Sequence, residues 1–329
     1  MIRVTTNSTL HMYQSNLMQS SNQLYSAMEK LMTGRNFDSY ASNPAGATRA
    51  FKLHSALNAV NAQAANNETV LNKFGTAYSI LDEVTNELTH DLAQAPALGG
   101  LDNSHLSSLN SYAQVIRSGA DAIVQVLNGK YENDFIFNGS ETGEAPFAIQ
   151  EDQSQNPPVD VLTFRGWRVD VPNNDDVYLD LNGKEVLENG VPLTNSDVHD
   201  KLTDMAGETL YVDVGLGFQL DRNGAVIPST AFDSALSGMD ILGFGLDEDG
   251  DPKNIVSIML RISDVFGGYQ HNDAANTEGT WGPAGNYDDA SRLVSKFEKA
   301  HNGLIRGARG AQLPGRLSGD QSDPPEKHL

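Results

Sequence analysis

Apolar residues recur at heptad spacing through the first 130 residues of this 329-residue chain. The first run has a leucine every seven residues and three weaker intermediate positions: Leu10, Tyr13, Leu17, Ser20, Leu24, Ala27 and Leu31. A seven-residue repeat of this length is typical of helices that pack along a common seam, because an ordinary surface helix drifts to a period of 3.6. The repeat therefore predicts long helices at the front of the chain.

Two further runs follow with better-filled seams. The second run alternates steps of four and three: Leu53, Leu57, Val60, Ala64, Asn67, Leu71, Phe74, Tyr78, Leu81, Thr85, Leu88 and Leu92. The third run is Leu106, Leu109, Ala113, Ile116, Ala120, Ile123 and Leu127. For these two helices we favour an intramolecular antiparallel bundle over a coiled coil with another chain. Asn67 either fixes the register of its seam or is a tolerated polar residue, and we favour the second interpretation.

Helix-ending residues separate the three runs. Gly34 ends the first helix, and the Asn43-Pro44 step begins the second. We expect Pro96, Gly99 and Gly100 to form the turn after the second helix, and Gly129 to close the third. The first helix buries little along its own seam, and short isolated helices are marginal in water. It therefore needs a partner from elsewhere in the chain or from another copy.

Charge divides the chain into parts. Residues 1–130 carry 8 basic and 9 acidic side chains, whereas residues 131–290 carry 7 and 30. We interpret the acidic middle as a solvated surface kept soluble by self-repulsion. The acidic balance argues against nucleic acid or an anionic membrane as a partner, because both require basic patches.

In the acidic middle the hydrophobic period changes from seven to two. Leu210, Val212, Val214, Leu216, Phe218 and Leu220 predict a strand with one buried face, followed by a turn at Asn223-Gly224. Residues 177–181, the Asn182-Gly183 turn and Val186 repeat this arrangement. Val159, Val161, Val169 and Val171 are further strand candidates, and residues 150–158 are expected to form a loop.

Helical spacing returns after this region. We expect a helix capped at Asp251-Pro252 and carried to Gly267, a loop over 269–286, and a final helix from Ala290 to Leu304. The predicted architecture is α+β: an elongated rod of heptad-patterned antiparallel helices with an inserted β-rich domain. Its predicted parts are an N-terminal core segment (1–42), the two halves of the rod (43–130 and 251–306), the acidic insert (131–250) and an irregular tail (307–329).

The sequence offers no positive sign of an enzyme. The chain has no Cys, which excludes disulfides, thiol catalysis and Cys-based zinc sites. Its eight His are scattered, and no Gly-rich phosphate loop is present. The acidic run at 247–251 only faintly matches a calcium loop, because Gly245 and Val256 would stand at ligand positions. We therefore expect no catalytic residue, cofactor or metal, and we favour a solvated turn at this run.

Specific motifs resemble the flagellin family. Leu31-Met32-Thr33-Gly34-Arg35, followed by Asn43-Pro44-Ala45-Gly46, resembles the family's N-terminal signature. Residues 134–140, with Phe135, Phe137 and Gly139, followed by Pro146-Phe147, resemble the hook-associated protein 3 branch, which joins hook to filament. Residues 230–233 and 237–240 are similar to a segment that precedes the returning helix in that branch. The resemblance covers residues 1–147 well and 210–306 loosely.

This resemblance implies a structural, non-enzymatic subunit. Such proteins are exported to the extracellular flagellum without a cleaved signal peptide and assemble into a ring of identical subunits through their terminal helices. Leu10, Leu17, Leu24 and Leu31 would then form the self-assembly seam. The implied partners are a neighbouring hook-associated protein, flagellin and an export chaperone. A filament flagellin, or a flagellin-like protein with a ligand-binding or enzymatic insert at 150–250, remains an alternative.

One departure from the family concerns the last residues. Members end in a long helix that pairs with the N-terminal one, whereas heptad spacing here stops near Leu304 and is followed by Gly307, Gly310 and Pro314. We expect no helix of the required length there. Truncation, natural variation and a frame error remain open as explanations.

Overall fold

The computed structural model describes residues 6–34, 41, 43–101, 106–141, 143–154, 158–267 and 286–311. The chain divides into two compact units, Met1–Ala65 and Asn66–Leu329. The first unit contains helix α1 (Thr6–Thr33) and the beginning of α2 (Pro44–Asp82). These bounds confirm the predicted helix end at Gly34 and the predicted start at Pro44.

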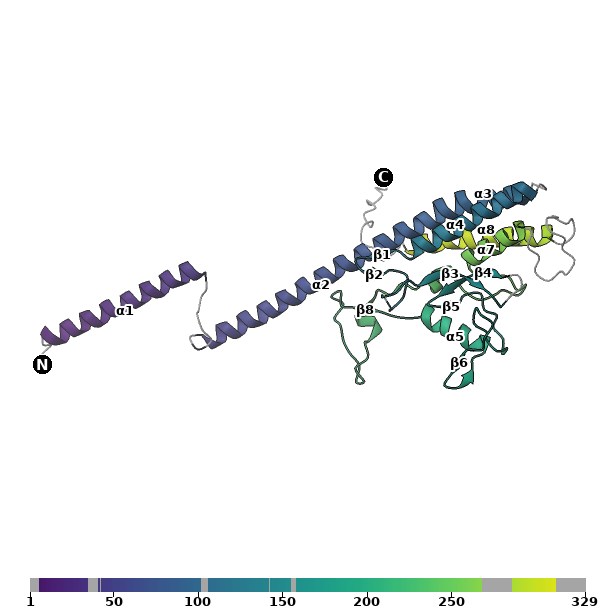
Figure 1. Cartoon of the computed structure of the whole chain (residues 1–329). Coiled ribbons are helices and arrows are strands. Elements are labelled where there is room, and N and C mark those ends of the chain that lie inside the picture. Colours follow the sequence, from purple (N-terminus) through teal and green to yellow (C-terminus); the bar gives the residue numbers. More distant parts are fainter. Residues whose placement is uncertain are drawn as a thin grey trace, which may run out of the picture. The chain divides into compact units, whose positions relative to one another are not determined.

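The second unit contains a group of packed helices. The helical elements after α2 are the π-helical segments η1 (Glu83–Leu88) and η2 (His90–Gln94), then α3 (Ala95–Leu101), α4 (Leu106–Leu127), α5 (Asn195–Ala206), the 3₁₀ turn η3 (Pro228–Thr230), α6 (Gly238–Leu242), α7 (Ile255–Phe266) and α8 (Asn286–Ala311). Helix α7 packs against both α4 and α8, and α3 packs on α4 (Figure 1). The returning helices α7 and α8 therefore share a core with η1, η2, α3 and α4.

Within the described residues the strands are short and pair in antiparallel fashion. They form four small sheets: β1 (Lys130–Tyr131) with β2 (Asp134–Phe135); β3 (Phe147–Asp152) with β4 (Val159–Phe164) and β5 (Trp167–Arg168); β6 (Leu187–Glu188) with β7 (Val191–Pro192); and β8 (Tyr211–Val212) with β9 (Phe232–Asp233). The three-stranded sheet lies along α4 and α7 (Figure 1). Together with the helices it gives an α+β fold, as predicted.

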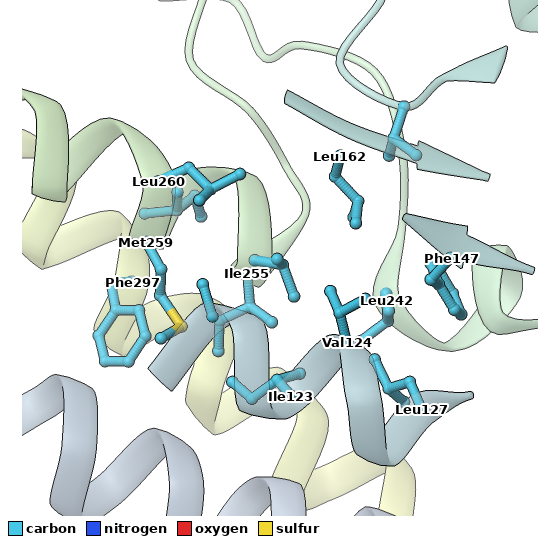
Figure 2. Packing of buried hydrophobic residues seen from close by; sticks show 14 of the residues in the cluster. Ile123, Val124, Leu127, Phe147, Leu162, Leu242, Ile255, Met259, Leu260 and Phe297 are labelled. Atoms are coloured by element: carbon cyan, nitrogen blue, oxygen red, sulfur yellow. The ribbon is translucent and has the colours of Figure 1, made fainter. Parts of the chain in front are cut away.

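One hydrophobic core joins this sheet to the helices. Figure 2 shows Val124 and Leu127 of α4 near Leu162 of β4, with Ile255 and Met259 of α7 beside them. All five side chains are buried. Each buried aliphatic side chain contributes on the order of 1.5–3 kcal/mol relative to exposure. The sheet is therefore attached to the helices mainly by the burial of apolar side chains, and polar contacts fix its orientation.

The expected turn at Pro96, Gly99 and Gly100 is wrong. These residues lie inside α3, which continues the helical path to Leu101. Pro96 is the second residue of α3 and directly follows the π-helical segment η2. Gly100 serves packing, since a β-carbon there would lie 2.3 Å from Cε2 of the Phe266 ring.

The expected long strand at 210–220 is also wrong. Only Tyr211–Val212 form a strand, and the large apolar side chains that follow, Leu216, Phe218 and Leu220, are exposed. Gly215 and Gly217 adopt positive φ, at 94° and 85°, which interrupts an extended path. The turn at Asn223-Gly224 is confirmed by the bridge between Leu220 and Val226.

Three smaller boundaries differ from the prediction. Residues 150–152 belong to β3 instead of a loop, because they pair with β4. Helix α7 begins at Ile255, because the Asn254 side chain caps it by accepting from the Val256 amide at 2.9 Å. Helix α8 continues past residue 306 to Ala311. Residues 268–285, most of the expected loop, and residues 312–329 of the expected tail lie outside the described residues.

Candidate functional site

The predicted self-assembly seam lies uncovered on α1. Leu10, Leu17, Leu24 and Leu31 are 55%, 61%, 61% and 84% exposed. From Ser8 to Thr33 every side chain is exposed except Ser21, which is partly covered. Further apolar side chains of α1 are exposed as well: Met12, Tyr13, Met18, Tyr25, Met28 and Met32. An apolar surface of this extent on one helix is typical of an interaction site.

The uncovered apolar surface continues along the first part of α2. Phe51, Leu53, Leu57 and Val60 are exposed, and so is Leu71 in the second unit. The later members of this run are covered: Phe74, Tyr78 and Leu88 partly, and Leu81 and Thr85 almost fully. The expectation that an intramolecular bundle fills the second seam is therefore wrong for residues 53–71 and holds for residues 74–88. The earlier residues need a partner that the described chain does not supply.

The motif residues near position 40 end one helix and begin the next. The Thr33 hydroxyl donates to the Glu29 carbonyl at 2.7 Å, and Gly34, at φ +65°, donates to the Lys30 carbonyl at 3.0 Å. Pro44 is the first residue of α2, and the Asn43 side chain accepts from the Gly46 amide at 2.9 Å. These residues therefore act in helix capping. Arg35 lies outside the described residues.

The second motif forms a packed cluster around the buried side chains of Phe137 and Phe147, which we call the hub. The hub joins the motif to residues 236–238. The Gly139 amide donates to the Leu236 carbonyl at 3.0 Å, and the Gly238 amide donates to the Phe137 carbonyl at 2.9 Å. Two segments about 100 residues apart, each of which resembles the same family, are thus hydrogen-bonded to each other.

Pro146 and Phe147 attach this hub to the helices and the sheet. The Asn128 side chain, just after α4, accepts from the Phe147 amide at 3.0 Å and donates to its carbonyl at 2.8 Å. The Pro146 carbonyl accepts from the Arg165 amide at 2.7 Å. The Phe147 ring meets Phe164 edge-on, with centroids 5.1 Å apart. Phe135 lies in β2 beneath the Lys130 ammonium, 4.2 Å from its ring centroid.

An ion pair that the sequence analysis missed closes the hub. Arg165 donates to Glu208 at 2.6 and 2.8 Å and to the Asn138 side chain at 2.7 Å. The hydrogen bonds from Arg165, and then those from Ser140, lower the pKa of Glu208 to about 2, against the opposing effect of burial. Sequence spacing gave no sign of this pair, because 43 residues separate its partners.

The acidic run at 247–251 is the candidate metal cluster among the described residues. Carboxylate oxygens of Asp247, Asp249 and Asp251 lie within 4.8 Å of one another. The Lys296 ammonium of α8 contacts all three, at 2.7, 2.9 and 2.6 Å. Arg292 adds an ion pair to Asp251 at 2.8 Å. Two side-chain cations therefore offset part of the negative charge of the cluster, and the run is linked to α8 instead of forming a free solvated turn.

The carboxylates raise the pKa of Lys296. Desolvation favours the neutral amine, but the hydrogen bonds that the ammonium donates to Asp247, Asp251 and Asp249 outweigh it and hold the charged form. The opposite change occurs at the carboxylates, since hydrogen bonds from Arg292 and Lys296 outweigh desolvation and lower the pKa of Asp251. The cluster is therefore charged on both sides at neutral pH.

Two His that are far apart in the sequence come together. The His90 and His301 ring centroids are 6.4 Å apart, and His301 Nδ1 lies 2.9 Å from the Thr89 hydroxyl. Thr89 donates to the Val84 carbonyl at 2.7 Å, so it accepts from Nδ1–H of His301. Burial first, and then the neighbouring His90, lower the pKa of His301. Among the described residues this pair is not part of a group of side chains that could hold a metal ion.

Comparison with known proteins now bears on this geometry. Residues 4–142 match the bacterial flagellin N-terminal helical region. Residues 4–142 therefore form a flagellin-like region. The match covers the exposed seam of α1 and the first part of the hub, and it marks the chain as a structural component of the flagellum.

The solved structures to which the chain is similar are distant in sequence. A flagellar hook-associated protein described from Vibrio parahaemolyticus is 15% identical, with a TM-score of 0.45 over 84% of this chain and 89% of that one. FlgL from Bacillus cereus is 12% identical, with a TM-score of 0.42 over 80% and 88%. FlgL from Xanthomonas campestris is 12% identical, with a TM-score of 0.41 over 80% and 93%. No curated protein matches the chain.

The length and hydropathy of the described helices bear on whether the chain could span a membrane. None of them is both long and apolar enough to cross a membrane.

Proposed function

We propose that this flagellin-like chain is a hook–filament junction subunit that assembles into a ring through its terminal helices. The observation that carries the proposal is the uncovered leucine seam of α1 within a flagellin-type helical region. Burying such side chains between subunits contributes on the order of 1.5–3 kcal/mol each. A helix without a covering in the single chain gains this free energy only on assembly.

The buried hub at residues 134–147 supports the junction role over that of a filament flagellin. Its Phe-x-Phe-x-Gly and Pro-Phe elements resemble the hook-associated branch, and ordinary filament flagellins generally lack them. Phe137 and Phe147 are buried and Gly139 adopts φ +62°, so the residues of the motif have a structural role in packing this region. The proposed neighbours are a hook-associated protein on one side and flagellin on the other, with an export chaperone before assembly.

The proposed location is the extracellular flagellum, reached by export without a cleaved signal peptide. Neither an enzymatic activity nor a cofactor forms part of the proposal. In this role the acidic insert at 131–250 presents a charged surface to solvent, and Phe147 attaches it to the end of α4 through the Asn128 side chain.

Deletion of the gene in its own bacterium tests the junction role. We expect hooks without filaments and flagellin released into the medium, and normal filaments in the deletion strain would refute the role. Short or fragile filaments on intact junctions would instead identify the chain as a filament flagellin.

Complementation with seam variants tests the assembly mechanism. Leu17→Glu with Leu24→Glu places two charges on the seam, and we expect it to abolish filament formation because each buried charge costs several kcal/mol. Gln19→Glu with Ser26→Glu is the matched control, since it adds the same charges to exposed positions on another face of α1. Equal motility of the two complemented strains would contradict assembly through the leucine seam.

A further inference from the structure

A small polar cavity lies where the three-stranded sheet meets α7. Its volume is about 30 Å³, which is enough to hold a water molecule. The polar side chains that line it are Asp160, Arg168, Asp170, Ser257, Arg261 and Asp264. The cavity therefore places three carboxyl groups and two guanidinium groups at the attachment between sheet and helices.

The arginines around this cavity are already engaged by other acceptors. Arg117 of α4 pairs with Asp160 of β4 and reaches Asp121 at 3.5 Å. Arg168 of β5 pairs with Asp152 and Asp170, each at 2.6 Å.

Arg261 of α7 is engaged in the same way. It donates to the Gly250 carbonyl at 2.8 Å and contacts Asp251 at 3.4 Å. It lies 3.9 Å from Asp170. No guanidinium group therefore remains for the third carboxyl group of the cavity.

Asp264 is that remaining group. It is half-buried, and within the described part of the chain no side chain forms a hydrogen bond or an ion pair with its carboxyl. Burial, and then the like charge of Asp160, raise its pKa to about 7, although the more distant Arg117 and Arg261 act in the opposite direction. An ionised carboxylate here is partly desolvated and has no paired counter-ion among the described residues.

The Ser257 hydroxyl is the second unpaired group of the cavity. Ser257 is 3% exposed, and its Oγ has no hydrogen-bond partner among the described residues. It stands seven residues before Asp264 on α7, so the two side chains lie on one face of the helix. The cavity thus contains an unpaired hydroxyl and an unpaired carboxyl together.

We propose that Asp264 is a proton-binding site that couples pH to the attachment of β4 to helices α4 and α7. In the protonated state the carboxyl is neutral, does not repel Asp160, and adds a hydrogen-bond donor to the cavity that contains Ser257. In the ionised state two like charges face each other between β4 and α7. Alkaline solution therefore loosens the sheet from the helices, and mildly acidic solution tightens it.

The sign follows from linkage between protonation and folding. An Asp in the unfolded chain ionises near its ordinary pKa of 3.8, whereas the folded chain keeps the proton up to about pH 7. The unfolded state therefore binds fewer protons between these values, and stability falls as pH rises through this window. Above it the effect is constant.

The test compares the full-length chain with Asp264→Asn at pH 5 and pH 8. Asn is neutral at both values, so we expect the wild-type unfolding equilibrium constant to rise at least about tenfold more over this interval than that of the variant. Asp121→Asn is the matched control, because it removes a carboxylate from the exposed side of the same Arg117. The control keeps the wild-type difference between the two pH values. An Asp264→Asn chain with that same full difference would overturn the proposal.

A second measurement on the wild-type chain does not depend on whether the variant folds. Carbon-13 labelling of the Asp carboxyl groups allows the titration of Asp264 to be followed directly. A midpoint near 7 supports the proposal, and a midpoint near 4 overturns it.

Discussion

Two glycines determine how the residues of the hub approach one another. A β-carbon at Gly238 would lie 2.3 Å from Cζ of Phe147, and one at Gly139 would lie 2.4 Å from a carboxylate oxygen of Glu208. Both glycines belong to segments that the sequence analysis identified by resemblance. Their role is to let aromatic and charged side chains pack against bare backbone.

We expect Gly238→Ala to destabilise the chain by about 1–3 kcal/mol, because the added methyl group overlaps the Phe147 ring in a buried site. The free energy of unfolding, measured by chemical denaturation, checks this value. Gly143→Ala is the control, because a β-carbon there meets no atom within 4 Å. If both variants lose the same stability, the close approach of Gly238 and Phe147 is not the cause.

At the scale of elements, helix α8 contacts the π-helical segments through a polar pair, His301 and Thr89, within an otherwise apolar interface. The Thr85 and Thr89 hydroxyls satisfy carbonyls of the widened turns, with Thr85 donating to Leu81 at 2.8 Å. His301 of α8 then donates to Thr89. A π-helical turn is costly on its own, and these side chains compensate for it.

Acidification should weaken this contact. Because the pKa of His301 is lowered in the folded chain, the unfolded state takes up a proton first as pH falls below about 6.5, and stability is lost. We expect His301→Gln, whose amide can still donate to Thr89, to lose less stability between pH 7 and pH 5 than the wild type. His54→Gln, at an exposed position, serves as the control. Identical acid sensitivity of His301→Gln and the wild type would refute this role.

Sequence periodicity predicted the elements whose stability is local or repetitive. The leucines of α1, Gly34, Pro44 and the Asn223-Gly224 turn all lie where expected, because each acts through neighbours a few residues away. Long-range partners had no such signal, as with Arg165 and Glu208 or Thr89 and His301. Helix α5 was missed although its capping box, Thr194 with Asp197, is visible in the sequence. Gly100 was misread because a glycine that permits close packing looks the same as one that ends a helix.

For the molecule as a whole, burial predicts very uneven protection from hydrogen exchange. We expect amides of α1 and of α2 up to about residue 70 to exchange rapidly in the dilute monomer, because their apolar side chains are uncovered. Amides of α4 and α7 should exchange slowest, since they surround the core. Mass spectrometry of exchanged peptides measures both, and assembled material provides the comparison. Rigid, slow-exchanging α1 in the monomer would contradict assembly-coupled ordering.

The contact of Lys296 with three aspartates bears on whether the fold depends on metal ions in the medium. In many proteins a loop rich in carboxylates closes only around a divalent ion taken from the surroundings. Here the positive charge is covalently part of the polypeptide, so this closure forms as soon as α8 meets residues 247–251. We therefore expect the contact between α8 and residues 247–251 to form without a divalent ion, at high and at low calcium concentrations alike.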